Sequence, residues 1–285
     1  MSEFTVHGDI KPPVKRIVSL APSVTELLYY LGLGNNVVGV TRQCDFPEPV
    51  KDISTVGSFL KPDVNLITEL RPDIIIGLGD LHKHLLEIID SGRIGQILFN
   101  YYSVRGVLDA MEIVASLAED VKSASELVAA LRQRVQEIRA KTDGVPSVRT
   151  LFMMYDEPIY TPGGGSYMYD ALKIAGALQM PYDNAQYERV TMEQVTECNP
   201  EVVFACGRHR DEPPRKICPG CQAENPICLR IVDDIAIRPQ WRETKAAQTG
   251  RILALPCDWL CRAGPRLIDG MEKIARILGG IDAEH

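Results

Sequence analysis

Short apolar runs alternate along the chain with segments in which apolar residues recur at helical spacing. The runs are four to six residues long and are bounded by proline, glycine or charged residues, which is typical of strands buried on both faces. We predict strands at 16–20, 36–41, 73–77, 96–99, 149–154, 201–205 and 251–255. Helical spacing covers 104–118 and, with charges on the opposite face, 123–141. The alternation of strands and helices predicts an α/β protein with mostly parallel sheets.

One strand and its flanks occur twice. Residues 68–76 read Thr-Glu-Leu-Arg-Pro-Asp-Ile-Ile-Ile, and residues 196–204 read Thr-Glu-Cys-Asn-Pro-Glu-Val-Val-Phe. In each copy a proline ends a helix and an apolar strand follows. A helix ending in Leu31-Gly32-Leu33 precedes the first copy, and one ending in Ala175-Gly176-Ala177 precedes the second. The two copies lie too far apart in the sequence to be units of a solenoid. We therefore predict two related Rossmann-like lobes with a ligand cleft between them.

The long charged helical segment is the natural connection between the lobes. We therefore predict an N-terminal α/β lobe over 1–118, a single connecting helix within 119–146, and a C-terminal α/β lobe over 147–285. An irregular Cys-rich insertion at 206–228 interrupts the second lobe.

Composition and charge narrow the classes of function. With 45% hydrophobic and 24% charged residues the chain has a globular composition, and a net charge of −7 without a basic stripe argues against nucleic-acid binding. No apolar stretch approaches the length of a membrane span, so we do not expect an integral membrane protein. The first residues lack a basic segment followed by an apolar one, which predicts a cytoplasmic protein. A periplasmic or cell-surface protein is the alternative if a leader has been removed. We expect a monomer.

Five metal-ligating side chains lie close together in the Cys-rich insertion: Cys206, His209, Cys218, Cys221 and Cys228. Two close ligand pairs on irregular backbone suit tetrahedral zinc, and the four cysteines would equally suit an iron–sulfur cluster. The alternatives are reduced, unligated thiols or, in an exported protein, a Cys218–Cys228 disulfide.

Other polar motifs carry weaker signals. His82 and His84 follow a strand end, where they would either give an axial nitrogen to a metal-bearing ligand or, more commonly, be solvated at a helix N-terminus. The Gly-rich loop 161–166 lacks the nucleotide-binding spacings, so we expect a flexible loop and reject nucleotide hydrolysis. Because no nucleophile–base arrangement is recognisable, we predict that the protein is not an enzyme.

Aromatic residues gather near the predicted strand ends of both lobes. Several aromatics at the carboxyl ends of strands predict a wide apolar cleft with few polar anchors. They are Phe46, Phe59, Tyr101, Tyr155, Tyr160, Tyr167, Tyr187 and Trp259.

Five stretches together resemble the substrate-binding proteins of cobalamin and ferric-siderophore ABC importers. They are Arg-Ile-Val-Ser-Leu-Ala-Pro-Ser-Val-Thr-Glu-Leu (16–27), Val-Gly-Val-Thr-Arg-Gln-Cys-Asp-Phe-Pro (38–47), Leu-Arg-Pro-Asp-Ile-Ile-Ile (70–76), Val-Thr-Met-Glu-Gln-Val (190–195) and Asp-Trp-Leu-Cys-Arg-Ala-Gly-Pro-Arg (258–266). The resemblance runs from about residue 15 to the end, and 44–47 and 258–266 look most like the cobalamin branch. It implies two α/β lobes joined by one long helix.

The resemblance also implies a ligand, a partner and site residues. The ligand would be a corrinoid, cobalamin or a cobinamide-like molecule, bound without chemistry for ABC-type uptake or intracellular handling. The implied ligand-binding residues are Gln43, Phe46, Gly57, Tyr187, Trp259 and Arg262. An importer permease would dock on one carboxylate per lobe. Glu193 matches the second, while Asn65 stands at the first position with Asp63 two residues before it. The alternatives are a ferric-siderophore or haem binder of the same fold, and a cytoplasmic metalloprotein or corrinoid-handling enzyme using the Cys206–Cys228 segment.

Overall fold

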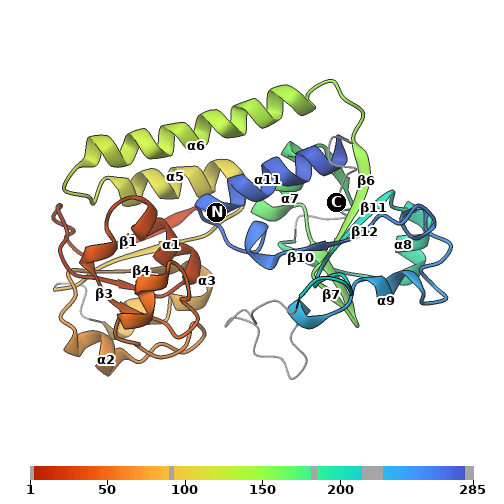
Figure 1. The fold of residues 1–285 in the computed structure, drawn as a ribbon. Helices are drawn as coiled ribbons and strands as arrows, with labels where there is room; N and C mark the ends of the chain where they lie inside the picture. The colour runs from red at the N-terminus through yellow and green to blue at the C-terminus, as the bar shows by residue number, and fades with distance from the viewer. Residues whose placement is uncertain (1–2, 90–92, 181–184, 214–226, 280–285) are drawn as a thin grey trace. The chain divides into compact units, whose positions relative to one another are not determined.

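The computed structural model describes residues 3–89, 93–180, 185–213 and 227–279. The chain divides into two compact units. The first comprises Met1–Tyr101, Arg105–Gln133 and Ala263–Pro265, and the second comprises Tyr102–Val104, Arg134–Arg262 and Arg266–His285. Helix α6 (Val121–Thr142) runs through both of them (Figure 1). None of the helices in the described part is long and apolar enough to cross a membrane.

The first unit is built on a five-stranded sheet in the order β1-β5-β4-β2-β3. Strands β2, β3, β4 and β5 are parallel, whereas β1 pairs antiparallel with β5 at one edge. The strands are β1 (Phe4–His7), β2 (Ile17–Ser19), β3 (Val37–Val40), β4 (Ile74–Leu78) and β5 (Gly95–Phe99). The helices are α1 (Pro22–Tyr30), η1 (Gly34–Asn36), η2 (Glu48–Asp52), α2 (Val64–Glu69), α3 (Gly79–His82), α4 (Leu85–Ile88) and α5 (Val104–Ala115).

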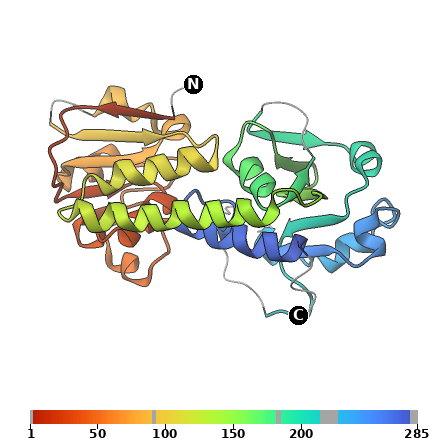
Figure 2. The ribbon, with the colours of Figure 1, turned by 90° about the horizontal axis from the view of Figure 1, so that it is seen from above.

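Helix α5 lies alongside the first half of α6 in both views (Figures 1 and 2). Arg132 of α6 donates to Asp109 of α5 across 2.7 Å, and Ser125 donates to Glu112. The side of α5 without these contacts is apolar, with Val107, Met111 and others fully buried.

The second unit contains a four-stranded parallel sheet in the order β12-β11-β6-β9 and a three-stranded antiparallel sheet in the order β10-β8-β7. The strands are β6 (Val148–Met153), β7 (Tyr155–Asp156), β8 (Ile159–Pro162), β9 (Ala177–Gln179), β10 (Tyr187–Val190), β11 (Val202–Cys206) and β12 (Ile252–Leu255). The helices are α7 (Tyr167–Ile174), α8 (Met192–Cys198), η3 (Ile227–Leu229), α9 (Asp233–Ala236), α10 (Lys245–Gln248), η4 (Cys257–Trp259) and α11 (Pro265–Leu278).

The two parallel sheets share one topology. The order β3-β2-β4-β5 in the first unit corresponds to β9-β6-β11-β12 in the second. Strand β4 begins at residue 74 and β11 at residue 202, which reproduces the separation between residues 68 and 196 found in the sequence repeat. Both strands are apolar and almost wholly buried, as the continuous apolar runs predicted. The fold class, two α/β lobes with mostly parallel sheets linked by one long helix, is confirmed.

The repeat also extends to the ends of the helices. Leu31 is the C-cap of α1 and Ala175 is the C-cap of α7. Each is followed by a glycine in the left-handed region, Gly32 at φ +80° and Gly176 at φ +92°. Only glycine takes this conformation without strain, which explains why a glycine follows the C-cap of both helices. Asp63 caps α2 and Thr191 caps α8 at corresponding positions.

Candidate functional site

In the first unit, the predicted ligand residues lie on the segment between β3 and α2. The N–H of Arg42 donates to the carbonyl of Gly57 across 3.0 Å, so the two arms of this segment run close together. Gly57 has φ +94°, and a Cβ there would lie 2.8 Å from the backbone nitrogen of Asp63 and the carbonyl of Lys61. Gly57 is therefore required by the close approach of backbone rather than by space for a ligand.

Gln43 is buried inside this segment. Its Oε1 accepts a hydrogen bond of 2.7 Å from the N–H of Phe59. Phe46 on the same segment is 46% exposed. Of the two, Phe46 is exposed to solvent, whereas Gln43 is buried and bonds the main chain of Phe59.

His82 is fully buried at the carboxyl end of β4. The N–H of Leu78 donates to its Nδ1 across 3.0 Å, so the ring proton is on Nε2, which donates to the carbonyl of Phe59 across 2.8 Å. Burial lowers the pKa of His82, the Phe59 hydrogen bond opposes that change, and nearby His84 lowers the pKa further. Both sequence hypotheses are wrong for His82, which is neither solvated nor left with a nitrogen for a metal. His84 is exposed, as the commoner hypothesis predicted.

In the second unit, three tyrosines line an apolar hollow of about 480 Å³ on the three-stranded sheet, which we call the tyrosine hollow. Tyr187 pairs with Pro162 in the antiparallel register, which puts Tyr187 diagonal to Tyr160 on one face of the sheet. The rings of Tyr155 and Tyr160 meet edge to face at 6.3 Å. The lining residues are Met154, Tyr155, Glu157, Pro158, Tyr160 and Tyr187.

Ion pairs fix the strand that carries Tyr155. Asp156, next to it on β7, accepts from Arg230 at 2.9 Å and from Arg238 at 3.0 Å, one guanidinium at each carboxylate oxygen. All three charged groups are largely shielded from solvent, so these pairs are stronger than surface ion pairs. They join β7 to the residues on either side of α9, Arg230 before it and Arg238 after it.

Trp259 lies in η4, between β12 and α11. The Nζ of Lys273 is 4.4 Å from the ring centroid, a cation–π contact. Gly270 of α11 lies so close that a Cβ there would be 2.3 Å from the Trp259 carbonyl. Trp259 and Arg262 are both half-buried, and the chain between them leads directly into α11.

The described part of the Cys-rich insertion contains no group of three or more potential metal ligands. The N–H of Ala254 donates to Nε2 of His209, and Nδ1 of His209 contacts Asp233 at 3.3 Å, so both ring nitrogens are engaged within the protein. Cys206 ends β11 and Cys228 lies in η3, both buried. Cys218 and Cys221 lie outside the described residues. The zinc or iron–sulfur site therefore gains no support.

Several N–H groups of the Gly-rich loop donate to carbonyls within the protein. The N–H of Gly163 bonds the carbonyl of Gln186, that of Gly165 bonds the carbonyl of Ala185, and Ser166 caps α7. A phosphate needs such N–H groups free, so these contacts agree with the rejection of nucleotide hydrolysis.

The two predicted docking carboxylates have different local roles. Glu193 is the second residue of α8 and is fully exposed, and its pKa is lowered mainly by a hydrogen bond from the Thr191 hydroxyl. Asn65 is likewise the second residue of α2. Asp63 accepts from the N–H groups of Asn65 and Leu66 and so caps that helix.

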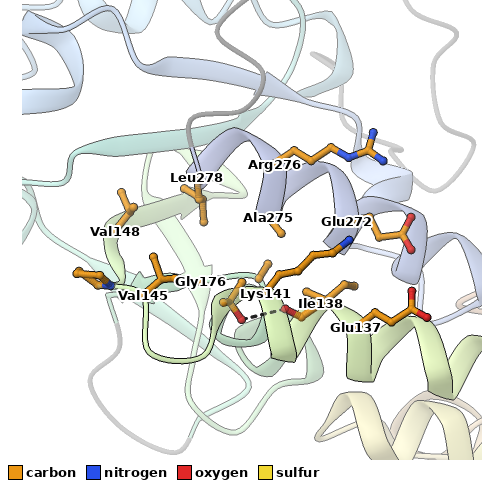
Figure 3. A pocket seen from close by; sticks show the side chains of 14 residues that line it. Glu137, Ile138, Lys141, Val145, Val148, Gly176, Glu272, Ala275, Arg276 and Leu278 are labelled. Carbon is orange, nitrogen blue, oxygen red and sulfur yellow. Dashed lines mark hydrogen bonds between the residues drawn. The ribbon is translucent and has the colours of Figure 1, made fainter.

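A second hollow, of about 460 Å³, lies between the C-terminal half of α6 and α11 (Figure 3). Val145, Val148, Gly176 and Leu278 form an apolar end, and Glu137, Glu272 and Arg276 form a charged one. Beside it, Arg134 of α6 bonds both carboxylate oxygens of Glu272 and one of Asp269, at 2.6 to 2.9 Å. None of the predicted ligand residues lines this hollow, and its mixed charges suit an extended apolar ligand less well than the tyrosine hollow does.

Two lobes that share one strand order define the fold class, that of two-lobed α/β proteins. Residues 17–258 match the family described as periplasmic binding protein, and the chain belongs to that family. It is therefore a substrate-binding protein by family.

Curated relatives match over nearly the whole chain. A vitamin B12-binding protein of Vibrio cholerae serotype O1 is 25% identical over 93% of this chain and 90% of its own length. An uncharacterized ABC transporter substrate-binding lipoprotein of Bacillus subtilis, YvrC, is 27% identical over 93% of this chain and 80% of its own. Among solved structures, the periplasmic vitamin B12 binding protein BtuF of Vibrio cholerae superposes with a TM-score of 0.75 at 23% identity, covering 96% of this chain and all of that one.

Proposed function

We propose that this protein binds a corrinoid, cobalamin or a cobinamide-like molecule, without chemical change. The observation that carries the proposal is the match to a vitamin B12-binding protein over 93% of this chain and 90% of that relative. A corrin is a broad macrocycle with apolar faces and a rim of amide side chains. Its faces suit stacked or edge-on aromatic contacts, and its rim suits a few polar anchors.

The aromatic surfaces of the two units support this ligand. In the second unit, Tyr187 is half-exposed in the tyrosine hollow, and Trp259 and Arg262 lie on the segment before α11. In the first unit, Phe46 is exposed on the segment that Gly57 closes. We assign ligand contact to Phe46, Tyr187, Trp259 and Arg262, and a supporting role to Gln43 and Gly57.

The partner that this function needs is an ABC-type permease. Glu193 is fully exposed at the start of α8, where a docking carboxylate is accessible. At the corresponding helix start in the first unit, the exposed carboxylate is that of Asp63, which caps α2. The family name, and a relative named a lipoprotein, favour a periplasmic or cell-surface location over the cytoplasmic one expected from the N-terminal residues.

Ligand-dependent thermal stabilisation tests the proposal. A ligand that binds only the folded protein raises the melting temperature in proportion to the logarithm of its concentration over its Kd. We expect cobalamin or cobinamide to raise the melting temperature, and haem and a ferric siderophore to have no effect at the same concentration. A shift with haem or the siderophore alone would contradict the corrinoid assignment and favour the other ligand class.

A further inference from the structure

Three residues on one face of α11 contact the η4 turn, which carries Trp259. Arg266, Gly270 and Lys273 follow one another at spacings of four and three residues, so they lie on the same face of the helix. We call these three residues the η4-facing stripe. Each of them makes a different kind of contact with Asp258 or Trp259.

Arg266, the first residue of the stripe, forms an ion pair with Asp258. Its Nη1 donates to the carboxylate Oδ2 across 2.5 Å, and both side chains are only partly exposed. A pair of this kind is screened less by solvent than a fully exposed one. Because Asp258 directly precedes Trp259, the ion pair holds the η4 turn against the start of α11.

Gly270, the middle residue, allows the backbone of η4 to approach the helix closely. A Cβ at this position would lie 2.3 Å from the carbonyl oxygen of Trp259 and 2.7 Å from its Cβ. Glycine is a poor residue for a helix interior, so its presence here is explained by the close contact and not by helix formation. Any larger residue would have to push the turn away from α11.

Lys273, the last residue, covers one face of the Trp259 ring. Its Nζ lies over the ring, 4.4 Å from the centroid, which is a cation–π contact. The Trp259 side chain is half-buried, so part of the ring remains accessible. The cation therefore fixes the ring on one side and leaves the rest of it for a ligand.

A neighbouring face of α11 is bonded to α6. Arg134 of α6 bonds Asp269 and Glu272, which directly precede Gly270 and Lys273 in the sequence. One residue corresponds to a rotation of about 100° around a helix, so these ion pairs do not compete with the η4-facing stripe. Helix α11 is thus held by α6 on one face while it holds η4 on another.

We propose that Gly270 and Lys273 are positioning residues for the ligand contacts of the second unit, Trp259 and Arg262. The inference rests on the proposed corrinoid function. Arg262 follows Trp259 by three residues, and Leu260 between them is fully buried, so a shift of the η4 turn would move both contacts. Neither positioning residue needs to touch the ligand, because their effect on affinity comes from holding the turn in place.

Two substitutions at Lys273 separate its charge from its aliphatic chain. Lys273→Met keeps a long apolar chain and removes the cation, whereas Lys273→Arg keeps a cation able to lie over the ring. We expect Lys273→Met to raise the Kd for cobalamin about two- to fivefold, as for an exposed cation–π contact, and Lys273→Arg to restore the wild-type value. Arg276→Met is the matched control, because Arg276 is another exposed cation of α11 outside the η4-facing stripe, and it should leave the Kd unchanged.

The Trp259→Ala background tests whether Lys273 acts through the ring. If it does, adding Lys273→Met to Trp259→Ala causes no further loss of affinity, because the ring that the cation holds is gone. A loss of the same size in both backgrounds would overturn the positioning role. An unchanged Kd of Lys273→Met in the otherwise wild-type protein would overturn it as well.

Gly270→Ala tests the close approach of η4 to the helix. Calorimetric titration with cobalamin should show a rise in Kd of about fivefold or more, because the new Cβ must displace the turn. If this variant folds and binds like the wild type, Gly270 has no positioning role, and if it fails to fold, the Lys273 variants decide the inference. A wild-type protein that binds neither cobalamin nor cobinamide contradicts the proposed function and this inference with it. A binding wild type with neutral Gly270→Ala and Lys273→Met contradicts only this inference.

Discussion

Replacing Tyr187 by alanine should weaken ligand binding while leaving the fold nearly unchanged. Tyr187 is 50% exposed at the start of β10, so half of its surface is already solvated in the free protein. Removing a side chain that is half-exposed leaves no internal cavity, so the substitution should lower the free energy of unfolding by less than about 1 kcal/mol.

The expected loss of affinity follows from the area that a ligand would cover. An aromatic side chain has roughly 200 Å² to bury, so half-exposed Tyr187 offers roughly 100 Å² to a ligand. At about 25 cal/mol per Å² this area is worth about 2.5 kcal/mol, a factor of roughly 60 in Kd. Incomplete coverage and desolvation of the hydroxyl reduce the factor, so we expect a 10- to 60-fold loss, to order of magnitude.

Calorimetric titration of cobalamin into wild type and variant measures this difference. Tyr187→Phe keeps the ring and should bind within about threefold of the wild type. Leu178→Ala is the matched control, because Leu178 is 56% exposed in the same unit but lies on β9, outside the tyrosine hollow. An unchanged Kd for Tyr187→Ala, or an equal loss for Leu178→Ala, would refute the assignment of the tyrosine hollow to the ligand.

Three further predictions concern stability. Gly32→Ala and Gly176→Ala should each lower the free energy of unfolding by about 1–2 kcal/mol, because both glycines have positive φ and a new Cβ meets no serious obstacle, which leaves backbone strain as the main cost. Unequal shifts in urea midpoint for the two variants would show that the two helix ends differ. Asp63→Ala should lower the free energy of unfolding by about 1 kcal/mol through loss of the α2 cap, whereas Asp63→Asn keeps the cap and only removes the charge. An equal loss of stability in both variants would contradict the capping role of Asp63. The Arg134 hydrogen bonds lower the pKa of Glu272, so this contact stabilises the fold above the unfolded-state pKa of about 4.3 and is lost as the pH falls further. The difference in urea midpoint between wild type and Arg134→Met should therefore shrink as the pH is lowered from about 5 to about 3. A difference independent of pH would contradict the role of the Arg134–Glu272 contact in stability.

The sequence predicted the parts of the fold that leave a strong local pattern. The apolar runs at β4 and β11, with a proline before each, identified a repeat that the structure reproduces in strand order and in helix caps. The antiparallel strands were missed. Strand β7 has two residues, and β10 reads Tyr-Glu-Arg-Val without an apolar run, so neither carries a periodic signal.

The roles of buried polar residues depend on partners that are distant in the sequence. In Leu-His-Lys-His, the two histidines look equivalent, yet one is buried and the other is exposed. The difference arises from Phe59, 23 residues earlier, and from the space left by Gly77. Gln43 is a similar case, because its hydrogen-bond partner, the N–H of Phe59, lies 16 residues later in the sequence. Neither of these contacts can be read from the local sequence pattern.

Calorimetric and absorbance titration of the purified protein with cobalamin and with cobinamide tests the central claim most directly. We predict saturable binding of one corrinoid per chain, with measurable heat and a change in the corrinoid absorbance spectrum. Absence of both heat and spectral change, for both corrinoids, would contradict the assignment of this protein as a corrinoid-binding protein.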